Sequence, residues 1–440
     1  MEVHAMVWFF NAIYLLTLMF ASPWLVIRAV RSGRYREGWR EKLLGLVPRV
    51  SDQPTIWLHG VSVGEVQLLK PIADRLSASF PNYRLVISTT TGTGMKLARS
   101  LFANHTVCYF PLDFSWAVKR ALALIQPSMI VLGELEVWPN LVALAHRQEI
   151  PVVVINGRLS EKSFRGYLRA AWLLRPTFSK LALILAQNAT YAARFRELGG
   201  PCPRICVTGS TKFDNVTLDR NDHNVEQLRQ LIGVGNRFRI IVAGSTQDPE
   251  EAFILAAFQQ LAHRFPELRL VVVPRHAERF EQVYHLLRES KLSVIRRNQI
   301  QKPIAAEAWQ VLLVDTIGEL RYWWGLAEVA IVGGSFGTRG GQNMIEPAGY
   351  GANVAFGPNT WNFRDVVKAL TEHEAVTVLA DLSEIDGWLN HQLDFPEPGR
   401  ERGSRARQTI LEHQGATDRT VGFLGELLAG ASTCSARSAA

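Results

Sequence analysis

Acidic residues placed directly after short apolar segments are the first candidates for chemistry in this sequence. Glu65 ends the segment HGVSVGE, and Glu134 and Glu136 lie in the segment GELEVWPN. A carboxylate beside a cleft can act as a general base, but Glu65 can equally be a first-turn residue that favours the positive end of a helix dipole. In an extended loop, carboxylates two residues apart point in opposite directions, so one of Glu134 and Glu136 can face a cleft. A catalytic role and ordinary solvation both remain open for these residues.

Basic residues and a glycine-rich segment form a second group, which suits phosphate. Lys212 lies in GSTKFD, where it can offset negative charge on a leaving phosphate, although most such lysines are simply solvated. Arg275 follows the apolar run VVVP and is placed to bind phosphate in bidentate fashion. The segment 333–347 (GGSFGTRGGQNMIEP) precedes an expected helix, whose free backbone N–H groups suit a phosphate. Because it matches neither GxGxxG nor a Walker loop, the pattern indicates anion binding and no particular enzyme class.

Residues with the spacing of a metal site are missing from the sequence. Neither Asp-x-Asp nor HExxH occurs. None of the four cysteines forms a CxxC pair, and Cys202 and Cys206 have no His cluster near them in the sequence. We therefore expect no metal, and cysteines that are small buried residues in a reducing compartment.

The elements that must position these residues form two successive halves. At 440 residues the chain is too long for one ordinary core, and 48% hydrophobic residues suit packed domains. Short apolar runs alternate with amphipathic helices, which predicts parallel sheets covered on both faces. The polar stretch 214–236 separates the halves. The expected strands are 55–59, 85–88, 128–132, 151–155 and 181–186 in the first half and 239–242, 268–273, 311–314 and 329–332 in the second. Ligands bind beyond the carboxyl ends of such strands, where the candidate residues lie.

The amino-terminal segment is uncharged from Ala5 to Ile27 and long enough to cross a bilayer. Trp8 and Trp24 would lie at its two interfaces. A basic flank follows from Arg28 to Lys42, so the rest of the chain is expected to be cytoplasmic. A cleaved signal peptide lacks support because the charges follow the apolar core instead of preceding it, and a buried core helix is the other alternative. The flank contributes to the net charge of +8 and would attract an anionic lipid surface. Part of the basic excess is thus explained without a nucleic-acid partner.

Taken together, the candidate segments resemble the 3-deoxy-D-manno-octulosonic acid (Kdo) transferases of lipopolysaccharide synthesis. They occur in the order of that family and span nearly the whole chain, including the amino-terminal anchor. The matching segments are VSVGE at 61–65, GELEVWPNL at 133–141, NGRLSEKS at 156–163, GSTKFD at 209–214, VPRHAERF at 273–280, DTIGEL at 315–320, GGSFGTRGGQNMIEPA at 333–348 and GPNTWNF at 357–363.

The resemblance implies an α/β fold with two Rossmann-like doubly wound domains, the GT-B type of glycosyltransferase, behind a membrane-anchor helix at residues 1–30. Residues 50–215 would form the acceptor-binding domain and residues 236–425 the CMP-sugar-binding domain. Residues 426–440 form a tail that matches nothing in the family. The family needs neither metal nor cofactor.

The resemblance also implies roles for single residues. Glu65 matches the catalytic base, and Glu134 and Lys212 match residues that stabilise the transition state. The segments that contact CMP correspond to Pro274, Arg275, Ile317, Gly318, Glu319, Asn343, Met344, Ile345 and Glu346. Two neighbouring positions depart from the family, which often has Ser at Gly60 and His at Gln342.

The reaction so implied moves Kdo from CMP-Kdo to the lipid A precursor lipid IV-A, with inversion and release of CMP, on the cytoplasmic side of a bacterial inner membrane. Two alternatives remain. One is another nucleotide-sugar-dependent GT-B transferase that acts on a membrane lipid. The other is a non-catalytic nucleotide-sugar-binding membrane protein, which would not need Glu65.

Overall fold

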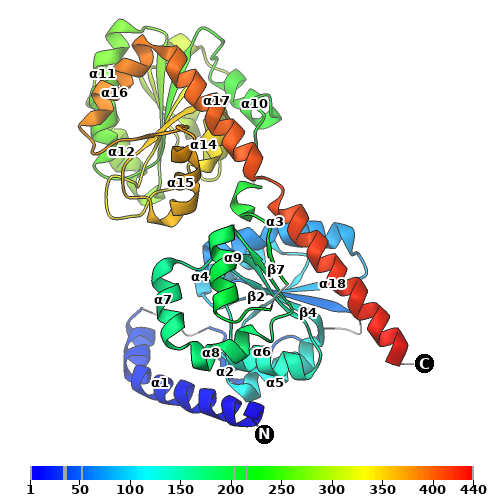
Figure 1. Cartoon of the computed structure of the whole chain (residues 1–440). Coiled ribbons are helices and arrows are strands. Elements are labelled where there is room, and N and C mark those ends of the chain that lie inside the picture. Colours follow the sequence, from blue (N-terminus) through cyan, green and yellow to red (C-terminus); the bar gives the residue numbers. More distant parts are fainter. Residues whose placement is uncertain (1, 33–36, 51–52, 202–203, 215, 439–440) are drawn as a thin grey trace. The chain divides into compact units, whose positions relative to one another are not determined.

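The computed structural model describes residues 2–32, 37–50, 53–201, 204–214 and 216–438. The chain forms two compact units, each built around one parallel sheet (Figure 1). The first unit comprises Met1–Asp214 together with Gln414–Ala440, and the second comprises Asn215–His413. Of the basic flank, Arg34 and Arg36 and the side chains of Arg28 and Arg31 lie outside the described residues. The side chain of Trp24, in the apolar segment, also lies outside them.

The sheet of the first unit has seven strands in the order β3-β2-β1-β4-β5-β6-β7. Along β1, Trp57 belongs to one apolar cluster while Ile56 and Leu58 belong to another, so the sheet is covered on both faces. Its strands are β1 (Thr55–His59), β2 (Arg84–Thr89), β3 (Thr106–Tyr109), β4 (Pro127–Gly133), β5 (Val152–Gly157), β6 (Leu183–Ala186) and β7 (Ile205–Val207). Its helices between residues 39 and 213 are α2 (Trp39–Leu44), α3 (Val63–Ser79), α4 (Gly92–Leu101), α5 (Ser115–Ile125), α6 (Pro139–Arg147), α7 (Glu161–Arg169), α8 (Ala171–Phe178), α9 (Ala189–Glu197) and the 3₁₀ turn η1 (Thr211–Phe213).

The second unit repeats this plan with the order β10-β11-β9-β8-β12-β13-β14. Its strands are β8 (Arg239–Thr246), β9 (Leu268–Pro274), β10 (Val294–Arg296), β11 (Val311–Leu313), β12 (Val329–Val332), β13 (Asn353–Phe356) and β14 (Thr377–Val378). Its helices are α10 (His223–Leu231), α11 (Glu250–Arg264), α12 (Phe280–Arg288), α13 (Leu320–Trp323), α14 (Ile345–Gly349), α15 (Arg364–Glu372), α16 (Glu384–Asp394) and α17 (Pro396–His413). Both sheets place their first strand centrally and wind outward in both directions, which confirms the two Rossmann-like, doubly wound halves predicted from the sequence.

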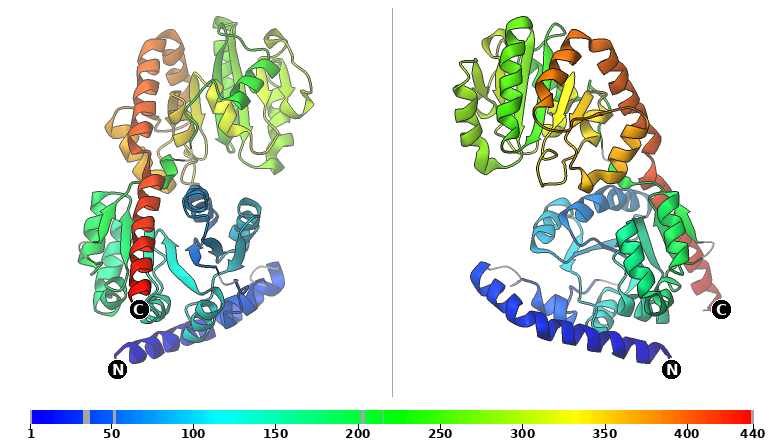
Figure 2. Two further views of the ribbon diagram at one scale, coloured as in Figure 1. Left: turned by 90° about the vertical axis from the view of Figure 1, so that its right-hand side faces the viewer. Right: turned by 60° about the vertical axis from the view of Figure 1, so that its left-hand side comes forward.

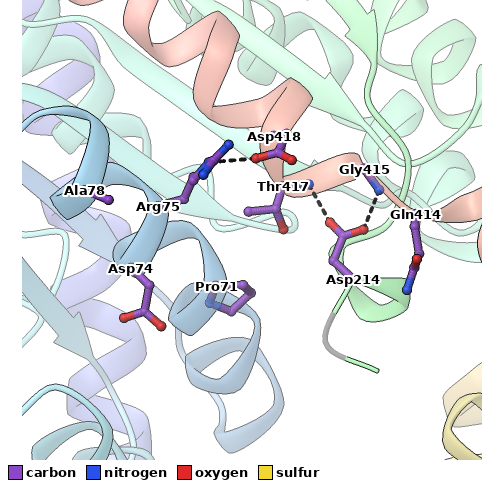
Figure 3. A pocket seen from close by; sticks show the side chains of 9 residues that line it. All are labelled: Pro71, Asp74, Arg75, Ala78, Asp214, Gln414, Gly415, Thr417 and Asp418. Atoms are coloured by element: carbon purple, nitrogen blue, oxygen red, sulfur yellow. Dashed lines mark hydrogen bonds and ion pairs between the residues drawn. The ribbon is translucent and has the colours of Figure 1, made fainter. Parts of the chain in front are cut away.

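The last helix, α18 (Ala416–Ser438), returns to the first unit. Leu424 and Leu428 lie in the same apolar cluster as residues of α3. Asp214 accepts hydrogen bonds from the backbone N–H groups of Gly415 (2.7 Å) and Thr417 (2.5 Å) at the start of this segment (Figure 3). The second unit ends at His413, whereas the sequence predicted 425 as the end of the second domain, and the helix α18 continues into the predicted tail 426–440. An amphipathic pattern shows that a helix has a buried face but not which sheet it covers.

The amino-terminal helix α1 (Glu2–Ser32) is 31 residues long. Its window Met6–Pro23 is long and apolar enough to cross a membrane, by length and composition. Only 17% of that window is buried in the unit, so the alternative of a buried core helix is wrong. Figure 2 shows α1 lying along one side of the first unit.

Candidate functional site

Glu65 lies at the carboxyl edge of the first sheet, in the first turn of α3. Ser62 caps this helix, since its Oγ accepts a hydrogen bond from the N–H of Glu65 (3.3 Å). The carboxylate accepts in return from Ser62 Oγ (2.9 Å) and from the N–H of Val61 (2.9 Å). This reciprocal arrangement is a variant of the capping box, in which Glu65 accepts from the N–H of Val61 instead of that of the N-cap residue Ser62. The helix-start interpretation of Glu65 is therefore correct as local structure, and the remaining lone pairs of the carboxylate still allow it to accept a proton.

The loop after the neighbouring strand β4 brings Glu134 to the same place. Glu65 and Glu134 both line one small cavity, together with Asn156 and Thr211. A Cβ atom at Gly133 would lie 3.2 Å from the carbonyl oxygen of His59, so a larger residue there would crowd β1. The φ of Glu134 is +52°, and its N–H donates to the carbonyl of Ile155 (2.9 Å). The adjacency of β1 and β4 thus unites two carboxylates that are far apart in the sequence.

Glu136 belongs to the same acidic group. Burial, together with the charges of Glu65 and Glu134, raises the pKa of its carboxyl to about 7. The extended loop expected for residues 134–136 is wrong, because Glu134 is left-handed and the N–H of Glu136 donates to the carbonyl of Gly133 (3.2 Å), as in a tight turn. The alternation of side chains that holds for a strand does not apply to such a turn.

Lys212 lies on the 3₁₀ turn η1, beside the same cavity. The N–H of its neighbour Thr211 donates to Asn156 Oδ1 (3.3 Å), which ties the turn to the end of β5. Ser210 caps the turn with its side chain. Glu65, Glu134 and the turn that bears Lys212 are therefore brought together at one edge of one sheet, with Thr211 of that turn lining the cavity.

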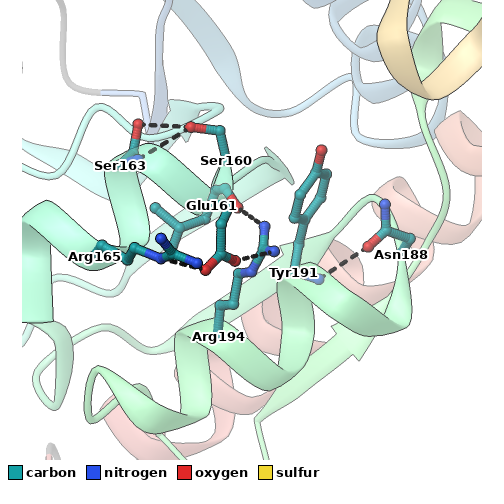
Figure 4. Close-up of polar contacts among 8 residues, drawn as sticks. Ser160, Glu161, Ser163, Arg165, Asn188, Tyr191 and Arg194 are labelled. Carbon is teal, nitrogen blue, oxygen red and sulfur yellow. Dashed lines mark hydrogen bonds and ion pairs between the residues drawn. The ribbon is translucent and has the colours of Figure 1, made fainter.

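The segment NGRLSEKS supports this edge. Ser160 caps α7, and Glu161 forms ion pairs with Arg165 (2.8 Å) and Arg194 (2.5 Å) (Figure 4). Arg194 also donates to the carbonyl of Leu159 (2.7 Å). These contacts join the start of α7 to α9 and fix the loop that follows β5.

In the second unit, the predicted CMP-contacting segments follow the neighbouring strands β11 and β9 and the strand β12, which β8 separates from β9. Pro274 is the buried last residue of β9, and the side chain of Arg275 is exposed beyond it. The N–H of Arg275 donates to the carbonyl of Thr246 (3.0 Å), which fixes the backbone while the guanidinium stays in solvent.

An ion pair between Arg297 and Glu319 fixes the loop 315–319. The carboxylate of Glu319 accepts two hydrogen bonds from Arg297 (both 2.9 Å) and one from Thr316 Oγ1 (2.9 Å). Gly318 has a φ of +92°, and Ile317 is 85% exposed. Because the Glu319 carboxylate is engaged by the protein itself, it positions the loop, whereas the exposed turn at 317–318 is open to a ligand.

The glycine-rich segment 333–344 leads into α14, which begins at Ile345. Asn343 donates to Glu346 Oε1 (3.0 Å) and accepts from the N–H of Ile345 (3.1 Å). Met344 is the buried residue that precedes the helix. Burial raises the pKa of the Glu346 carboxyl. The expected helix is short, at five residues.

Glu250 is a residue of this site that the sequence did not reveal. It is buried at the start of α11 and accepts from the N–H groups of Gln247 (2.9 Å) and Gly334 (2.8 Å). Burial raises the pKa of its carboxyl to about 7. The sequence DPEE indicates a helix start, but nothing in it shows that this carboxylate holds a glycine-rich loop 84 residues further along the chain.

Within the described ranges, no group of three or more His, Cys, Asp or Glu residues is arranged to hold a metal ion.

Comparison with known proteins places these features in one family. Residues 37–215 match the family model described as 3-Deoxy-D-manno-octulosonic-acid transferase (kdotransferase). The 3-deoxy-D-manno-octulosonic acid transferase of Bordetella pertussis is 32% identical, over 95% of this chain and 99% of its own length. The enzyme of the same name from Haemophilus influenzae is 30% identical, over 94% and 97%.

Solved structures support the fold. A glycosyltransferase from Rickettsia africae aligns with a TM-score of 0.56 at 12% identity, over 86% of this chain and 99% of its own. A UDP-GlcNAc 2-epimerase from Neisseria meningitidis also gives 0.56, at 13% identity over 85% and 100%. At such identities the likeness concerns the two-domain fold alone.

Proposed function

The chain belongs to the family of 3-deoxy-D-manno-octulosonic acid (Kdo) transferases, and we propose that it transfers Kdo from CMP-Kdo to lipid IV-A with inversion and release of CMP. The observation that carries the proposal is the gathering of Glu65, Glu134 and the turn that bears Lys212 around one cavity at the carboxyl edge of the first sheet. A carboxylate can act as the general base for the acceptor hydroxyl, and a cation can stabilise the charge that develops on the leaving phosphate.

In this proposal Glu65 takes the proton from a glucosamine hydroxyl of the lipid. The hydroxyl oxygen forms a bond to the anomeric carbon of Kdo, and the bond from that carbon to the phosphate oxygen breaks. CMP leaves with the electron pair of that bond. Lys212 offsets the negative charge that develops, and Glu134 acts with it on the transition state.

The second unit is proposed to hold CMP. Pro274 and Arg275 bind the nucleotide phosphate region, and the turn Ile317–Glu319 contacts it through its exposed backbone. Glu346 accepts hydrogen bonds from ribose hydroxyls, next to Asn343 (3.0 Å), Met344 and Ile345. Arginine and backbone donors thereby supply the charge stabilisation that a metal supplies elsewhere.

We place the protein at the cytoplasmic face of a bacterial inner membrane. Its apolar helix α1 and the basic residues that follow it support this location. The acceptor would then be within reach as a membrane lipid, and anionic headgroups would attract the flank.

The test is transfer by the purified chain with CMP-Kdo and lipid IV-A, followed by product mass. We expect CMP release in step with a mass gain of Kdo on the lipid. Turnover only with a different nucleotide sugar or lipid would establish another GT-B transferase. Tight CMP binding without turnover on any acceptor would establish a binding protein.

A further inference from the structure

Helix α1 is attached to the first unit along one face. Val7, Phe10 and Asn11 are buried and Tyr14 is half-buried. These positions are spaced i, i+3, i+4 and i+7, which is one stripe of an α-helix. The helix is therefore packed side-on against the unit, and it contacts α6 in particular.

The attachment includes buried and half-buried hydrogen bonds from Asn11 and Tyr14, inside the apolar window. Asn11 donates to Ser115 Oγ (2.7 Å) and accepts from the N–H of Ser115 (3.0 Å) and from Asn140 Nδ2 (3.1 Å). Tyr14 donates its hydroxyl to Asp113 Oδ2 (3.0 Å). The same Asp113 carboxylate accepts from the N–H of Asn140 (2.8 Å), so the network joins α1 to the starts of α5 and α6.

The remaining faces of α1 are apolar and exposed. Trp8 is 71% exposed and Phe20 78%, and Leu16 and Ile27 are also exposed. Large apolar patches of this kind mark an interaction surface. Two further tryptophans are exposed on helices that lie along the same side of the unit as α1 (Figure 1), Trp116 of α5 and Trp172 of α8. Tryptophan is enriched at the membrane–water interface, which makes a lipid leaflet the occupant that fits.

A spanning orientation conflicts with the buried network. In a spanning helix, the middle of the window lies at the centre of the hydrocarbon layer. Asn11 and Tyr14 would then either lose their partners there or draw Asp113 and the ends of two helices into lipid, and polar groups without partners are costly in that environment.

We propose that α1 lies in the plane of the membrane surface, with its docked face on the first unit and its exposed faces in one leaflet, so that it does not cross the bilayer. Interfacial helices lie in this plane with their apolar face in the leaflet and a polar face away from it. In α1 the stripe docked on the first unit takes the place of the polar face. This placement rests on the proposed function, in which the acceptor is a membrane lipid. It also puts the amino terminus on the same side of the membrane as both units.

The depth of single positions along α1 tests this placement. Spin labels are attached to Trp8→Cys, Leu16→Cys and Phe20→Cys, each in a background with the four native cysteines replaced, and the full chain is bound to phosphatidylethanolamine–phosphatidylglycerol vesicles. An in-plane helix gives three similar, shallow depths. A spanning helix rises about 1.5 Å per residue, so positions 8 and 20 would differ in depth by about 18 Å.

A depth difference of that size, or labels that stay in water, would overturn the proposal. The double variant Asn11→Leu, Tyr14→Phe is the matched comparison, since it removes the network and keeps the exposed faces. We expect its labels to move away from the shallow in-plane profile, and an unchanged profile would show that the network does not hold the helix. CMP release is measured on the same samples, so failure of the proposed reaction is distinguished from failure of the in-plane placement.

Discussion

At the scale of single residues, the Glu136 carboxyl makes the stability of the first unit depend on pH. Its pKa is about 7 in the folded chain, above the ordinary value of 4.5. Between pH 4.5 and pH 7, the Glu136 carboxyl is therefore protonated in the folded state and ionised in the unfolded state. Its contribution to the free energy of unfolding is present at low pH and falls as the pH rises from about 4.5 to about 7. Glu136→Gln removes the ionisation.

We expect Glu136→Gln to match the wild type near pH 4.5 and to be more stable at pH 8 by about 1–2 kcal/mol, a figure reduced for partial solvent screening. Thermal unfolding of both proteins at the two pH values measures this. If Glu136→Gln instead loses stability relative to the wild type between pH 4.5 and pH 8, the Glu136 carboxyl is ionised at neutral pH in the folded protein.

At the scale of elements, the ion pair between Arg297 and Glu319 holds the loop after β11 in its shape. Arg297→Met leaves the Glu319 carboxylate without its bidentate partner. We expect the Kd for CMP to rise on the order of tenfold, equivalent to about 1.4 kcal/mol, because the exposed turn at 317–318 loses its support. Isothermal titration with CMP measures the change.

Arg288→Met is the matched control for that variant. It removes the same charge from α12, where Arg288 is exposed and lies over the ring of Tyr284 (5.8 Å). Equal CMP affinities for the two variants would mean that the loop does not depend on the ion pair.

The sequence predicted the elements in the middle of each sheet better than those at its edges. Long apolar runs such as those of β1, β4, β8 and β9 are recognisable because both of their faces are buried. The strands β3, β7, β10 and β14 were not predicted, since each has at most four residues and partly exposed positions. The strand β13, which lies next to the edge strand β14, was also not predicted, because a run of four residues next to a glycine-containing turn carries little periodicity.

The candidate site was predictable as a set of loops but not as a set of contacts. The positions of Glu65, Glu134 and Lys212 after strands follow from the local pattern. Their proximity depends on the order of strands in the sheet and on the path of the chain after β7. Local sequence patterns predict neither of these. The contact from Glu250 to Gly334 (2.8 Å) is of the same kind.

At the scale of the whole molecule, the chain leaves the first unit after Asp214 and returns to it at Gln414. Leu424 of α18 is fully buried in the core of the first unit. Leu424→Ala should destabilise that unit by about 2–5 kcal/mol, as cavities in cores do. Hydrogen exchange resolved by peptide should then rise in β1 and β4 and stay unchanged in β8 and β9.

Glu426→Ala provides the comparison, because Glu426 is exposed two residues further along the same helix. Faster exchange in both sheets for Leu424→Ala would indicate that the two units unfold together. No change in either sheet would mean that α18 does not contribute to the first core.

The central claim is that Glu65 is the base of Kdo transfer, and turnover of Glu65→Gln tests it most directly. Gln can accept from the N–H of Val61 and so keep the start of α3, and the CMP-binding loops of the second unit are untouched. With CMP-Kdo and lipid IV-A, we predict that turnover falls on the order of a hundredfold or more while the Kd for CMP is unchanged. Glu226→Gln, the same change in the first turn of α10, should keep full activity. Near-normal transfer by Glu65→Gln would contradict the account.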